Sequence, residues 1–445
     1  MRNDNTVTSA STALLTDQYE LTMISAALRD KTAERQCCFE VFARRLPEGR
    51  RYGVVAGTQR AIDAIADFRF GPAELDVVSG ILDPDTLAWL ADYRFTGSID
   101  GYREGELYFP GSPILTVRGT FAEAVVLETL ILSVLNHDSA IAGAAARMVS
   151  AAGGRPIIEM GSRRTHEFAA VAASRAAYLA GLSSTSNLEA AREYGIPTAG
   201  TSAHAFTLLH TTADGPDEKA AFAAQIDALG VSTTLLVDTY DITQGVRNAI
   251  EVAGPGLGGV RIDSGELGVL ARQVRHQLDD LGAHGTKIVV SGDLDEYAIA
   301  ALRAEPVDTY GVGTSLVTGS GAPTSGMVYK LVEVDGIPVT KRAAHKETPG
   351  GAKAAVRTRR STGTIVEEII YPADSAAPDT NGLSATPLQI PLMRDGEPVA
   401  DIPSLADARE HLAQALVSLP WEGLGLSHGE PAIPTRYVMS QGNTR

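Results

Sequence analysis

The chain has 445 residues, of which 44% are hydrophobic and 21% charged. This is the composition of a globular protein, and the length corresponds to about three domains or to one large barrel with additions. The 38 Lys and Arg residues against 54 Asp and Glu residues give a net charge of −16, which disfavours non-specific binding to nucleic acid or to an anionic membrane. We therefore expect no nucleic-acid or membrane partner, and a phosphate-bearing ligand would need a local basic pocket.

The N-terminal region and the cysteines exclude several other classes of protein. The first residues lack the charged-then-apolar order of a signal peptide, and the most apolar helical stretch, 121–136, carries two glutamates and is too short to span a membrane. Cys37 and Cys38 are adjacent, so they supply neither a disulfide framework nor a metal-binding set, and we expect two small buried side chains on a strand. The sequence thus indicates a soluble, cytoplasmic protein.

Residues 35–110 mix strands and helices. Extended stretches over 36–45 and 100–119 alternate with amphipathic helices over 58–68 and 83–95. This order predicts an α+β layer rather than a parallel sheet.

Residues 155–330 repeat one pattern, a short apolar run followed by a polar loop and an amphipathic helix. This alternation predicts a parallel sheet or barrel. The apolar runs cover 155–159, 181–185, 196–200, 232–237, 259–262, 287–290 and 306–312, and the helices cover 165–181, 186–195, 217–230, 243–254, 266–282 and 295–305. Ser186 and Glu189 match a capping box and predict the start of the second helix. Seven runs in one series favour a barrel.

The C-terminal part returns to strands, over 327–339 and 361–371, on either side of a basic segment. The segment holds seven cationic residues against Glu347 alone: Lys341, Arg342, Lys346, Lys353, Arg357, Arg359 and Arg360. It is either an electrostatic funnel or lid for polyanions or a solvated hairpin face. A Pro- and Asp-rich stretch then leads to a last helix over 404–419, with Ser404 as its expected cap.

Polar residues follow the apolar runs of the predicted barrel. Because catalytic groups in such barrels come from the carboxyl ends of the strands, these residues are the candidates for a site. Two arginines, three aspartates, a histidine and a Gly-rich turn at one edge suit an anionic phosphate ester chelated by Mg²⁺. They include Arg163, Arg164, Ser186, His204, Asp238, Asp263, Ser291, Asp293 and the turn 311–315. Each aspartate taken alone could instead cap a helix, His204 could be structural, and the Gly-rich segment could be a plain turn.

Seven motifs in order resemble those of the nicotinate phosphoribosyltransferase family, over nearly the whole chain. They are TDQYELTM (16–23), EMGSRRTHE (159–167), GTSAHAF (200–206), VDTYD (237–241), RIDSGEL (261–267), VVSGDLDEY (289–297) and YGVGTSL (310–316). The resemblance implies a type II phosphoribosyltransferase with an incomplete, seven-strand α/β barrel of the TIM type and a discontinuous α/β sandwich. The implied domains are a sandwich part over 1–120, a catalytic barrel over 121–326 and a return to the sandwich over 327–445.

The resemblance also implies an activity. Nicotinate and phosphoribosyl pyrophosphate would give nicotinate mononucleotide and pyrophosphate, with Mg²⁺ as cofactor. ATP as co-substrate would be hydrolysed to ADP and phosphate through a phosphohistidine at His204. The chain would act as a homodimer with its active sites at the interface.

The matching motifs carry over residue roles. His204, Asp238 and Asp263 would be catalytic, with Asp263 also holding Mg²⁺ through pyrophosphate. Tyr19 from a partner subunit, Arg163 and Ser186 would bind nicotinate. Phosphoribosyl and phosphate groups would be bound by Arg261, Ser264, Gly265, Ser291, Gly292, Asp293, Gly311, Gly313 and Thr314.

Ser186 is the basis for preferring nicotinate. It stands where nicotinamide-using relatives carry an aspartate, which would repel a carboxylate. Met160 and Glu266 depart from residues frequent in the family, Phe and Asp. The alternatives are an enzyme using nicotinamide or quinolinate and a non-catalytic nucleotide-sensing relative.

Overall fold

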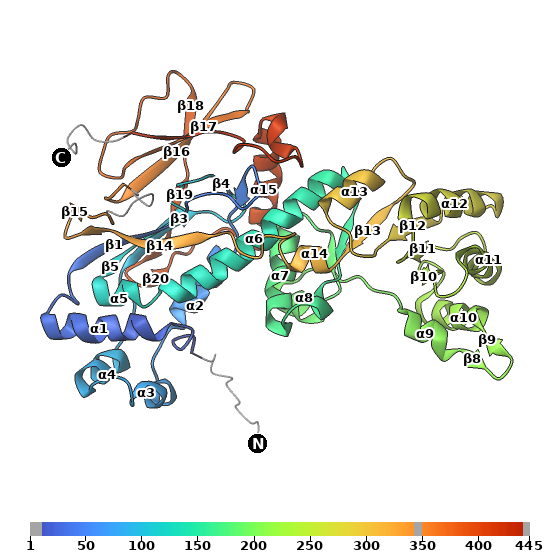
Figure 1. Ribbon diagram of the computed structural model, residues 1–445, viewed down its shortest axis with the longest axis horizontal. Helices are drawn as coiled ribbons and strands as arrows, with labels where there is room; N and C mark the ends of the chain where they lie inside the picture. Colours follow the sequence, from blue (N-terminus) through green and yellow to red (C-terminus); the bar gives the residue numbers. More distant parts are fainter. Residues whose placement is uncertain (1–10, 342–348, 439–445) are drawn as a thin grey trace. The chain divides into compact units, whose positions relative to one another are not determined.

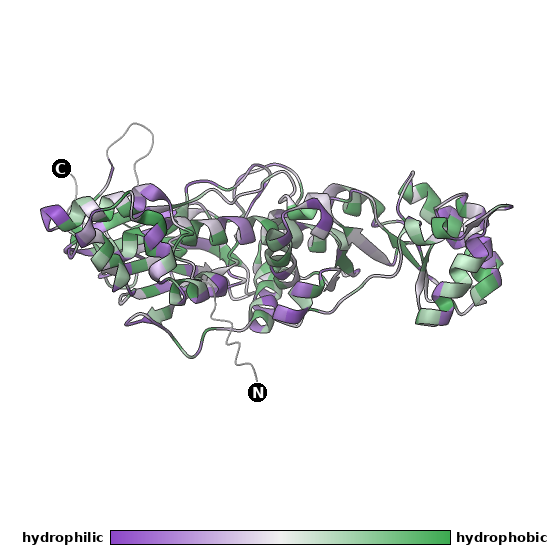
Figure 2. Cartoon of the chain, turned by 90° about the horizontal axis from the view of Figure 1, so that it is seen from below, coloured by the Kyte–Doolittle hydropathy of each residue, from purple (hydrophilic) through white to green (hydrophobic). Residues whose placement is uncertain are grey.

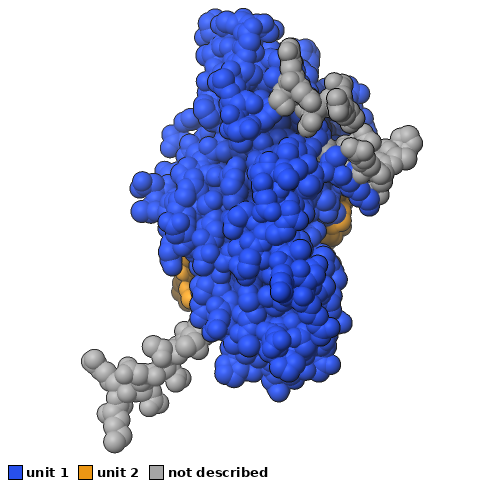
Figure 3. Space-filling model, turned by 90° about the vertical axis from the view of Figure 1, so that its left-hand side faces the viewer, with its two compact units in different colours: residues 1–140, 324–445 blue, residues 141–323 orange. Residues whose placement is uncertain are grey.

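The computed structural model describes residues 11–341 and 349–438, in two compact units. Unit 1 comprises residues 1–140 and 324–445, and unit 2 comprises residues 141–323; Figure 3 colours them separately. Unit 1 is therefore discontinuous in the chain. The helices of both units carry apolar and polar residues side by side, as amphipathic helices do (Figure 2).

Unit 1 is built from two stretches of chain. Its first stretch contains α1 (Gln18–Asp30), β1 (Gln36–Ala43), β2 (Gly53–Val54), α2 (Thr58–Ala66), α3 (Pro72–Val78), α4 (Pro84–Ala91), β3 (Ser98–Tyr102), β4 (Leu107–Tyr108), β5 (Leu115–Thr120), α5 (Phe121–Val125) and the start of α6 (Glu128–Ala152). Its second stretch contains β14 (Met327–Val334), β15 (Ile337–Pro338), β16 (Lys353–Arg359), β17 (Ile365–Pro372), β18 (Ser384–Pro387), β19 (Gln389–Arg394), β20 (Glu397–Pro398), α15 (Leu405–Ser418), the 3₁₀ turn η2 (Trp421–Leu424) and β21 (Thr435–Tyr437).

A seven-stranded sheet in the order β15-β14-β1-β5-β3-β19-β20 forms the centre of unit 1. In Figure 1 the four-stranded sheet β18-β16-β17-β21 lies on one side of it, and α1, α3 and α4 lie on the other. Because β1 is covered on both faces, seven of its eight residues are buried, including Cys37 and Cys38 as expected. Phe39 stacks on Tyr329 of β14 with ring centroids 4.8 Å apart.

Unit 2 alternates strands and helices. After the end of α6 it contains β6 (Ile157–Glu159), the 3₁₀ turn η1 (Ser162–Arg164), α7 (Glu167–Leu179), β7 (Ser184–Thr185), α8 (Leu188–Tyr194), α9 (His204–Leu209), β8 (Thr211–Thr212), β9 (Gly215–Pro216), α10 (Glu218–Leu229), β10 (Thr234–Leu236), α11 (Ile242–Ala253), β11 (Gly259–Ile262), α12 (Leu267–Asp280), β12 (Lys287–Val290), α13 (Glu296–Leu302), β13 (Thr309–Val312) and α14 (Thr314–Val317). All six helices predicted between the apolar runs are present.

The parallel sheet of unit 2 has six strands in the order β10-β11-β12-β13-β6-β7. The last strand of the series, β13, thus pairs with the first, β6, as a barrel requires. The seventh predicted run, 196–200, makes only an isolated parallel bridge between Thr198 and Thr185. It contains Pro197, which has no N–H to donate, and Ile196 is its only buried residue, so it lacks the run of buried apolar residues that the other strands have.

Two local predictions about unit 2 are wrong. The helix cap assigned to Ser186 is one residue later: Asn187 is the N-cap of α8, and its side chain accepts a hydrogen bond from the Ala190 amide at 2.9 Å. Asn is as good a cap as Ser, so the sequence pattern did not separate them. His204, expected in a loop, is instead the first residue of α9.

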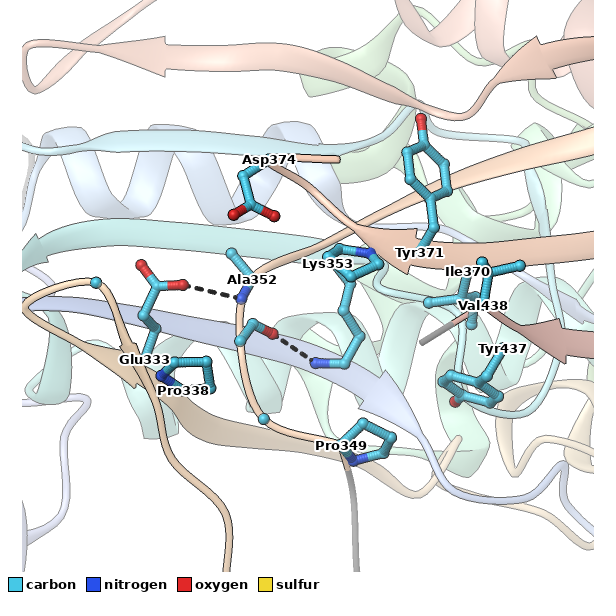
Figure 4. A pocket seen from close by; sticks show the side chains of 14 residues that line it. Glu333, Pro338, Pro349, Ala352, Lys353, Ile370, Tyr371, Asp374, Tyr437 and Val438 are labelled. Atoms are coloured by element: carbon cyan, nitrogen blue, oxygen red, sulfur yellow. Dashed lines mark hydrogen bonds between the residues drawn. The ribbon is translucent and has the colours of Figure 1, made fainter. Parts of the chain in front are cut away.

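Two members of the basic segment, Lys353 and Arg357, are buried in ion pairs and not exposed as its charge count suggested. Lys353 is 6% exposed, and its Nζ donates to Glu40 Oε2 and to the Gly351 carbonyl, each at 2.8 Å. Figure 4 shows this ammonium group beside a cavity of about 130 Å³ between the β14–β15 hairpin and the ends of β17 and β21. The buried Glu40 carboxylate neutralises the Lys353 ammonium group, so Lys353 is not available to bind a polyanion.

Arg357 is buried more completely, at 1% exposure. Its guanidinium pairs with Glu106 and with Glu368, the latter at 2.6 Å, and lies 5.4 Å from the Phe109 ring centroid. Tyr102 donates to the same Glu368 at 2.7 Å. Of the other members, Lys341 and Arg360 are exposed and Arg359 is half-buried. Arg342, Lys346 and Glu347 lie outside the described residues, and whether that part forms a lid stays a prediction.

One helical stretch, Phe121–Ala152, is long and apolar enough to cross a membrane by length and composition. Within the described residues, 67% of its most apolar window is buried inside the structure. A core helix passes the same test, and this helix contributes Leu127, Leu130 and Ile131 to the core of unit 1.

We predict that Arg357→Ala destabilises unit 1 by about 3–5 kcal/mol, because it leaves two buried carboxylates without their cation. Both tryptophans, Trp89 and Trp421, lie in unit 1, so urea denaturation followed by tryptophan fluorescence reports on this unit. The control is Arg29→Ala, which removes an ion pair whose arginine is 72% exposed and should shift the midpoint far less. Equal shifts for the two variants would show that the buried network adds nothing beyond a surface pair.

Candidate active site

A cavity of about 160 Å³ lies at the carboxyl ends of the parallel strands of unit 2. Four strands that are neighbours in the sheet, β11, β12, β13 and β6, supply it with residues at or just after their last positions. The lining residues are Met160, Arg163, Arg164, Arg261, Asp263, Ser291, Gly292, Asp293, Gly311, Val312, Gly313 and Thr314. The cavity therefore gathers many of the residues predicted from the sequence at one place: Arg163, Arg164, Arg261, Asp263, Ser291, Gly292, Asp293, Gly311, Gly313 and Thr314.

Arg261, Asp263 and Ser291 form one hydrogen-bonded group in this cavity. Arg261 Nε donates to Ser291 Oγ at 3.0 Å, and its Nη2 donates to Asp263 Oδ1 at 3.3 Å. Ser291 Oγ also donates to Asp263. Burial raises the pKa of Asp263, but the Ser291 hydrogen bond and the Arg261 charge outweigh it and hold that pKa below its usual value. Asp263 is therefore a carboxylate at neutral pH.

The turn after β12 depends on Gly292. Its φ is +115°, and a Cβ added there would lie 2.4 Å from the carbonyl oxygen of Asp263. Asp293, the next residue, also has a positive φ, +47°. Only glycine fits the first position without displacing the β11 loop, so this turn packs tightly on the loop that carries Asp263.

Asp238 ties the β10 loop to the β11 loop. Its Oδ2 accepts from the Asp263 amide and from Ser264 Oγ, both at 2.8 Å. The helix cap in this loop is Asp241, whose side chain accepts from the Gln244 amide, and not Asp238. The alternative role as a helix cap thus holds for Asp241 and fails for Asp238.

His204 faces the second oxygen of Asp238. His204 Nε2 lies 4.0 Å from Asp238 Oδ1, and its Nδ1 lies 3.1 Å from Thr239 Oγ1. The Asp238 side chain is 1% exposed and this Oδ1 has no hydrogen-bond partner among the described residues, whereas the His204 side chain is 41% exposed. The imidazole is reachable from solvent and stands beside a buried carboxylate oxygen that lacks a donor.

Of the residues expected to bind nicotinate or phosphate groups, some line this cavity and others do not. Arg163, in η1, is exposed and lines the cavity beside Met160. Ser186 follows β7, where its amide donates to the Glu159 carbonyl at 2.8 Å, but it does not line this cavity. Ser264 and Gly265 are exposed and also lie outside the lining.

Tyr19 belongs to unit 1, on α1, and is 46% exposed. Burial of part of the side chain, with the charges of Glu128 and Glu20, raises the pKa of Tyr19 to about 12. The phenol is therefore neutral at physiological pH.

Two residues of the site region were missed by the sequence reasoning. Glu159 is a buried carboxylate at the end of an otherwise apolar strand, and Asn187 links η1 to α8. A charged residue in a short buried strand is itself a signal, because such a charge needs dedicated partners.

Among residues 11–341 and 349–438, no group of three or more His, Cys, Asp and Glu side chains could hold a metal ion. Mg²⁺ needs no such group when it arrives with a substrate phosphate, since one or two carboxylates then suffice. Asp263, ionised and lining the cavity, fits that use.

Comparison with known proteins agrees with this geometry. Sequence models of the nicotinate phosphoribosyltransferase N-terminal domain and of the nicotinate phosphoribosyltransferase family match residues 14–136 and 156–361. Nicotinate phosphoribosyltransferase pncB1 of Mycobacterium tuberculosis is 65% identical over 428 residues, covering 96% of this chain and 95% of the relative.

Two solved structures share the fold. The crystal structure of human nicotinic acid phosphoribosyltransferase has a TM-score of 0.81 at 27% identity and covers 96% of this chain and 98% of that one. The nicotinate-nucleotide pyrophosphorylase of Pyrococcus furiosus has a TM-score of 0.77 at 24% identity and covers 94% and 99% of the two chains. The chain belongs to the nicotinate phosphoribosyltransferase family.

Proposed function

We propose that this protein joins nicotinate to phosphoribosyl pyrophosphate, giving nicotinate mononucleotide and pyrophosphate, in the salvage route to NAD. ATP hydrolysis to ADP and phosphate is coupled to this reaction. The observation that carries the proposal is the cavity in which an ionised Asp263, Arg261, Ser291 and two glycine-containing turns meet at the carboxyl ends of adjacent parallel strands.

The chemistry requires charge stabilisation rather than proton removal. The lone pair of the nicotinate ring nitrogen forms the new bond to the anomeric carbon, while the bond to the pyrophosphate oxygen breaks and its electron pair leaves with pyrophosphate. Positive charge develops on the ribose in the transition state, and fixed carboxylates such as Asp263 and Asp238 stabilise it. Arg261 binds the leaving group, where a guanidinium matches phosphate oxygens.

Two turns are suited to the 5′-phosphate. Ser291 to Asp293 and Gly311 to Thr314 both line the cavity, and backbone amides and hydroxyls in such turns bind phosphate oxygens. Asp263 would hold Mg²⁺, which neutralises charge on the pyrophosphate. The run 196–200, bridged to β7 at Thr198, would be the seventh strand of an incomplete barrel.

His204 is proposed to carry the ATP coupling. One imidazole nitrogen attacks the terminal phosphorus of ATP, forming a P–N bond as ADP leaves, and water later hydrolyses that bond. The exposure of His204 leaves room for the phosphoryl group. The modification adds negative charge and acceptor oxygens beside Asp238 and Asp263, where Mg²⁺ and Arg261 can respond to it.

Nicotinate is proposed to contact Arg163, Ser186 and Tyr19 of the partner subunit in a cytoplasmic homodimer. The exposure of Tyr19 leaves its ring available to stack on a pyridine. Arg163 offers a cation for the substrate carboxylate, and Ser186 is neutral and exposed.

The first test measures product formation from phosphoribosyl pyrophosphate and Mg²⁺ with nicotinate, nicotinamide or quinolinate as separate acceptors, each with and without ATP. We expect turnover with nicotinate alone, enhanced by ATP. Turnover with nicotinamide or quinolinate would overturn the substrate assignment, and no turnover with any acceptor would favour a nucleotide-sensing relative.

We predict that His204→Ala abolishes stimulation by ATP while leaving some ATP-independent product formation, because the acceptor of the phosphoryl group is gone. The ratio of initial rates with and without ATP measures this. His284→Ala is the control, since His284 precedes β12 at the amino end of the sheet and is 74% exposed. If ATP accelerates His204→Ala as it does the parent, the phosphohistidine assignment is wrong.

We predict that Ser186→Asp raises the KM for nicotinate about tenfold or more, because a carboxylate there repels the substrate carboxylate. The KM for phosphoribosyl pyrophosphate should change little. Ser186→Asn matches the size of the new side chain without its charge and should retain nicotinate binding. Equal effects of the Asp and Asn variants would show that the size of the side chain at position 186, and not its charge, determines nicotinate binding.

A further inference from the structure

We propose that Glu159 and Asn187, neither of which lines the cavity, form a clamp that fixes η1 and the residues after β7 relative to each other. The clamp would thereby determine how tightly nicotinate binds. This inference rests on the proposed roles of Arg163 and Ser186 in nicotinate binding. Glu159 and Asn187 are positioning residues that act through their neighbours in the chain.

The first half of the clamp is the Glu159 carboxylate. Glu159 is the last residue of β6 and is 1% exposed. Its Oε1 accepts from the Gly161 amide, and its Oε2 lies 2.9 Å from Ser174 Oγ and 2.5 Å from Thr185 Oγ1. One buried carboxylate thus joins the start of the Arg163 loop, helix α7 and the end of β7.

The second half is the Asn187 side chain. Its Nδ2 donates to Ser162 Oγ at 2.9 Å, while its Oδ1 caps α8. The Asn187 amide donates to Thr185 Oγ1 at 2.9 Å, so the threonine hydroxyl links the two halves. Ser162 precedes Arg163 and Asn187 follows Ser186, so the Asn187–Ser162 hydrogen bond joins the neighbours of both nicotinate-binding residues.

Gly161 makes this arrangement tight. A Cβ added at Gly161 would lie 2.2 Å from Val317 Cγ1, 3.0 Å from Glu159 Oε1 and 3.2 Å from the Gly313 carbonyl. The loop is therefore held between the Glu159 carboxylate on one side and α14 with the turn before it on the other. It has little room to shift and keep its hydrogen bond.

The residues that the clamp positions have no such support of their own. In the part of the chain that the structure describes, the Arg163 and Ser186 side chains are exposed and make no hydrogen bonds to protein groups. Their location depends on the backbone that carries them. Loosening that backbone raises the cost of ordering both side chains on the substrate.

Loss of the clamp should change the KM for nicotinate in a characteristic way. Arg163 and Ser186 contact the substrate ring and carboxylate, which change little between ground and transition state. Loss of the clamp should therefore raise the KM for nicotinate without changing kcat, because it weakens uniform binding. Neither half of the clamp contacts Asp263 or Arg261, so the KM for phosphoribosyl pyrophosphate should stay within about twofold of the parent value.

The test uses Ser162→Ala and Asn187→Ala, separately and combined, in the full-length protein with saturating phosphoribosyl pyrophosphate, Mg²⁺ and ATP. Each single variant should raise the KM for nicotinate about tenfold with kcat retained. The double variant should be no worse than Asn187→Ala, because both changes remove the same hydrogen bond. Glu159→Gln, which places an amide among three donors, should show the same split with a lower melting temperature.

The matched control for the lost helix cap is Asp217→Ala. Asp217 caps α10 as Asn187 caps α8, with its side chain accepting from the Ala220 amide, so this variant should lower the melting temperature without raising the KM for nicotinate. An Arg163→Ala variant reports on the proposed function itself. If Arg163→Ala raises the KM and Ser162→Ala does not, the clamp is wrong and the nicotinate site stands. If neither variant raises the KM for nicotinate, both the proposed role of Arg163 and the clamp are wrong.

Discussion

The parallel register of six strands is the constraint on which the candidate site depends. Because β13 pairs with β6, Met160, Arg163 and Arg164 line one cavity with residues 311–314, which are far away in the chain, and with the loops after β11 and β12. Side chains at the carboxyl end of a parallel sheet converge only if the strands begin and end in register. The short strands, of two to four residues, leave long loops at that end, and the loops are then held by hydrogen bonds between side chains and neighbouring backbone.

In these hydrogen bonds a buried carboxylate joins neighbouring segments of the site. Asp238 accepts from the Asp263 amide, and Glu159 accepts from Gly161 within its own loop and from Thr185 on the adjacent strand. Gly292 lies so close to the Asp263 carbonyl that a side chain would not fit. Neighbouring loops of the site are thus held together by hydrogen bonds and close packing.

The sequence predicted the alternating strands and helices of unit 2 because periodicity reports burial directly. It also predicted many of the residues that line the cavity, because polar residues follow the buried strands. The predictions were wrong where the sequence pattern gave no information on burial, or on which of two adjacent residues caps a helix. The charge count treated Lys353 and Arg357 as solvated, yet both are buried opposite Glu40, Glu106 and Glu368, residues more than 200 positions away or on the next strand. No short window of sequence contains the pairings with Glu40 and Glu106, and the pairing of Arg357 with Glu368 depends on the register of the β16–β17 hairpin.

The cap of α8 shows the same limit on a smaller scale. Ser186 and Asn187 are adjacent and equally suited to begin a helix, and the choice falls on Asn187 because its second amide atom also reaches Ser162. That frees the Ser186 hydroxyl from the cap. The proposed roles of Tyr19, Arg163 and Ser186 rest on motif resemblance and not on periodicity, since a stacking or carboxylate-binding role does not alter burial patterns.

Local charge, rather than the net charge of −16, decides what the cavity can bind. Its lining holds Arg163, Arg164 and Arg261 against Asp263 and Asp293, three positive groups against two negative ones, so its balance is 3 − 2 = +1. A phosphoribosyl pyrophosphate carries several more negative charges than this excess can neutralise. Under the proposed function, the remainder would be met by hydrogen-bond donors of the turns and by Mg²⁺. The lowered pKa of Asp263 means that a carboxylate is present to bind that cation. Since the same carboxylate would repel the substrate without the metal, the proposed function requires the magnesium complex of the substrate to bind in preference to the free anion.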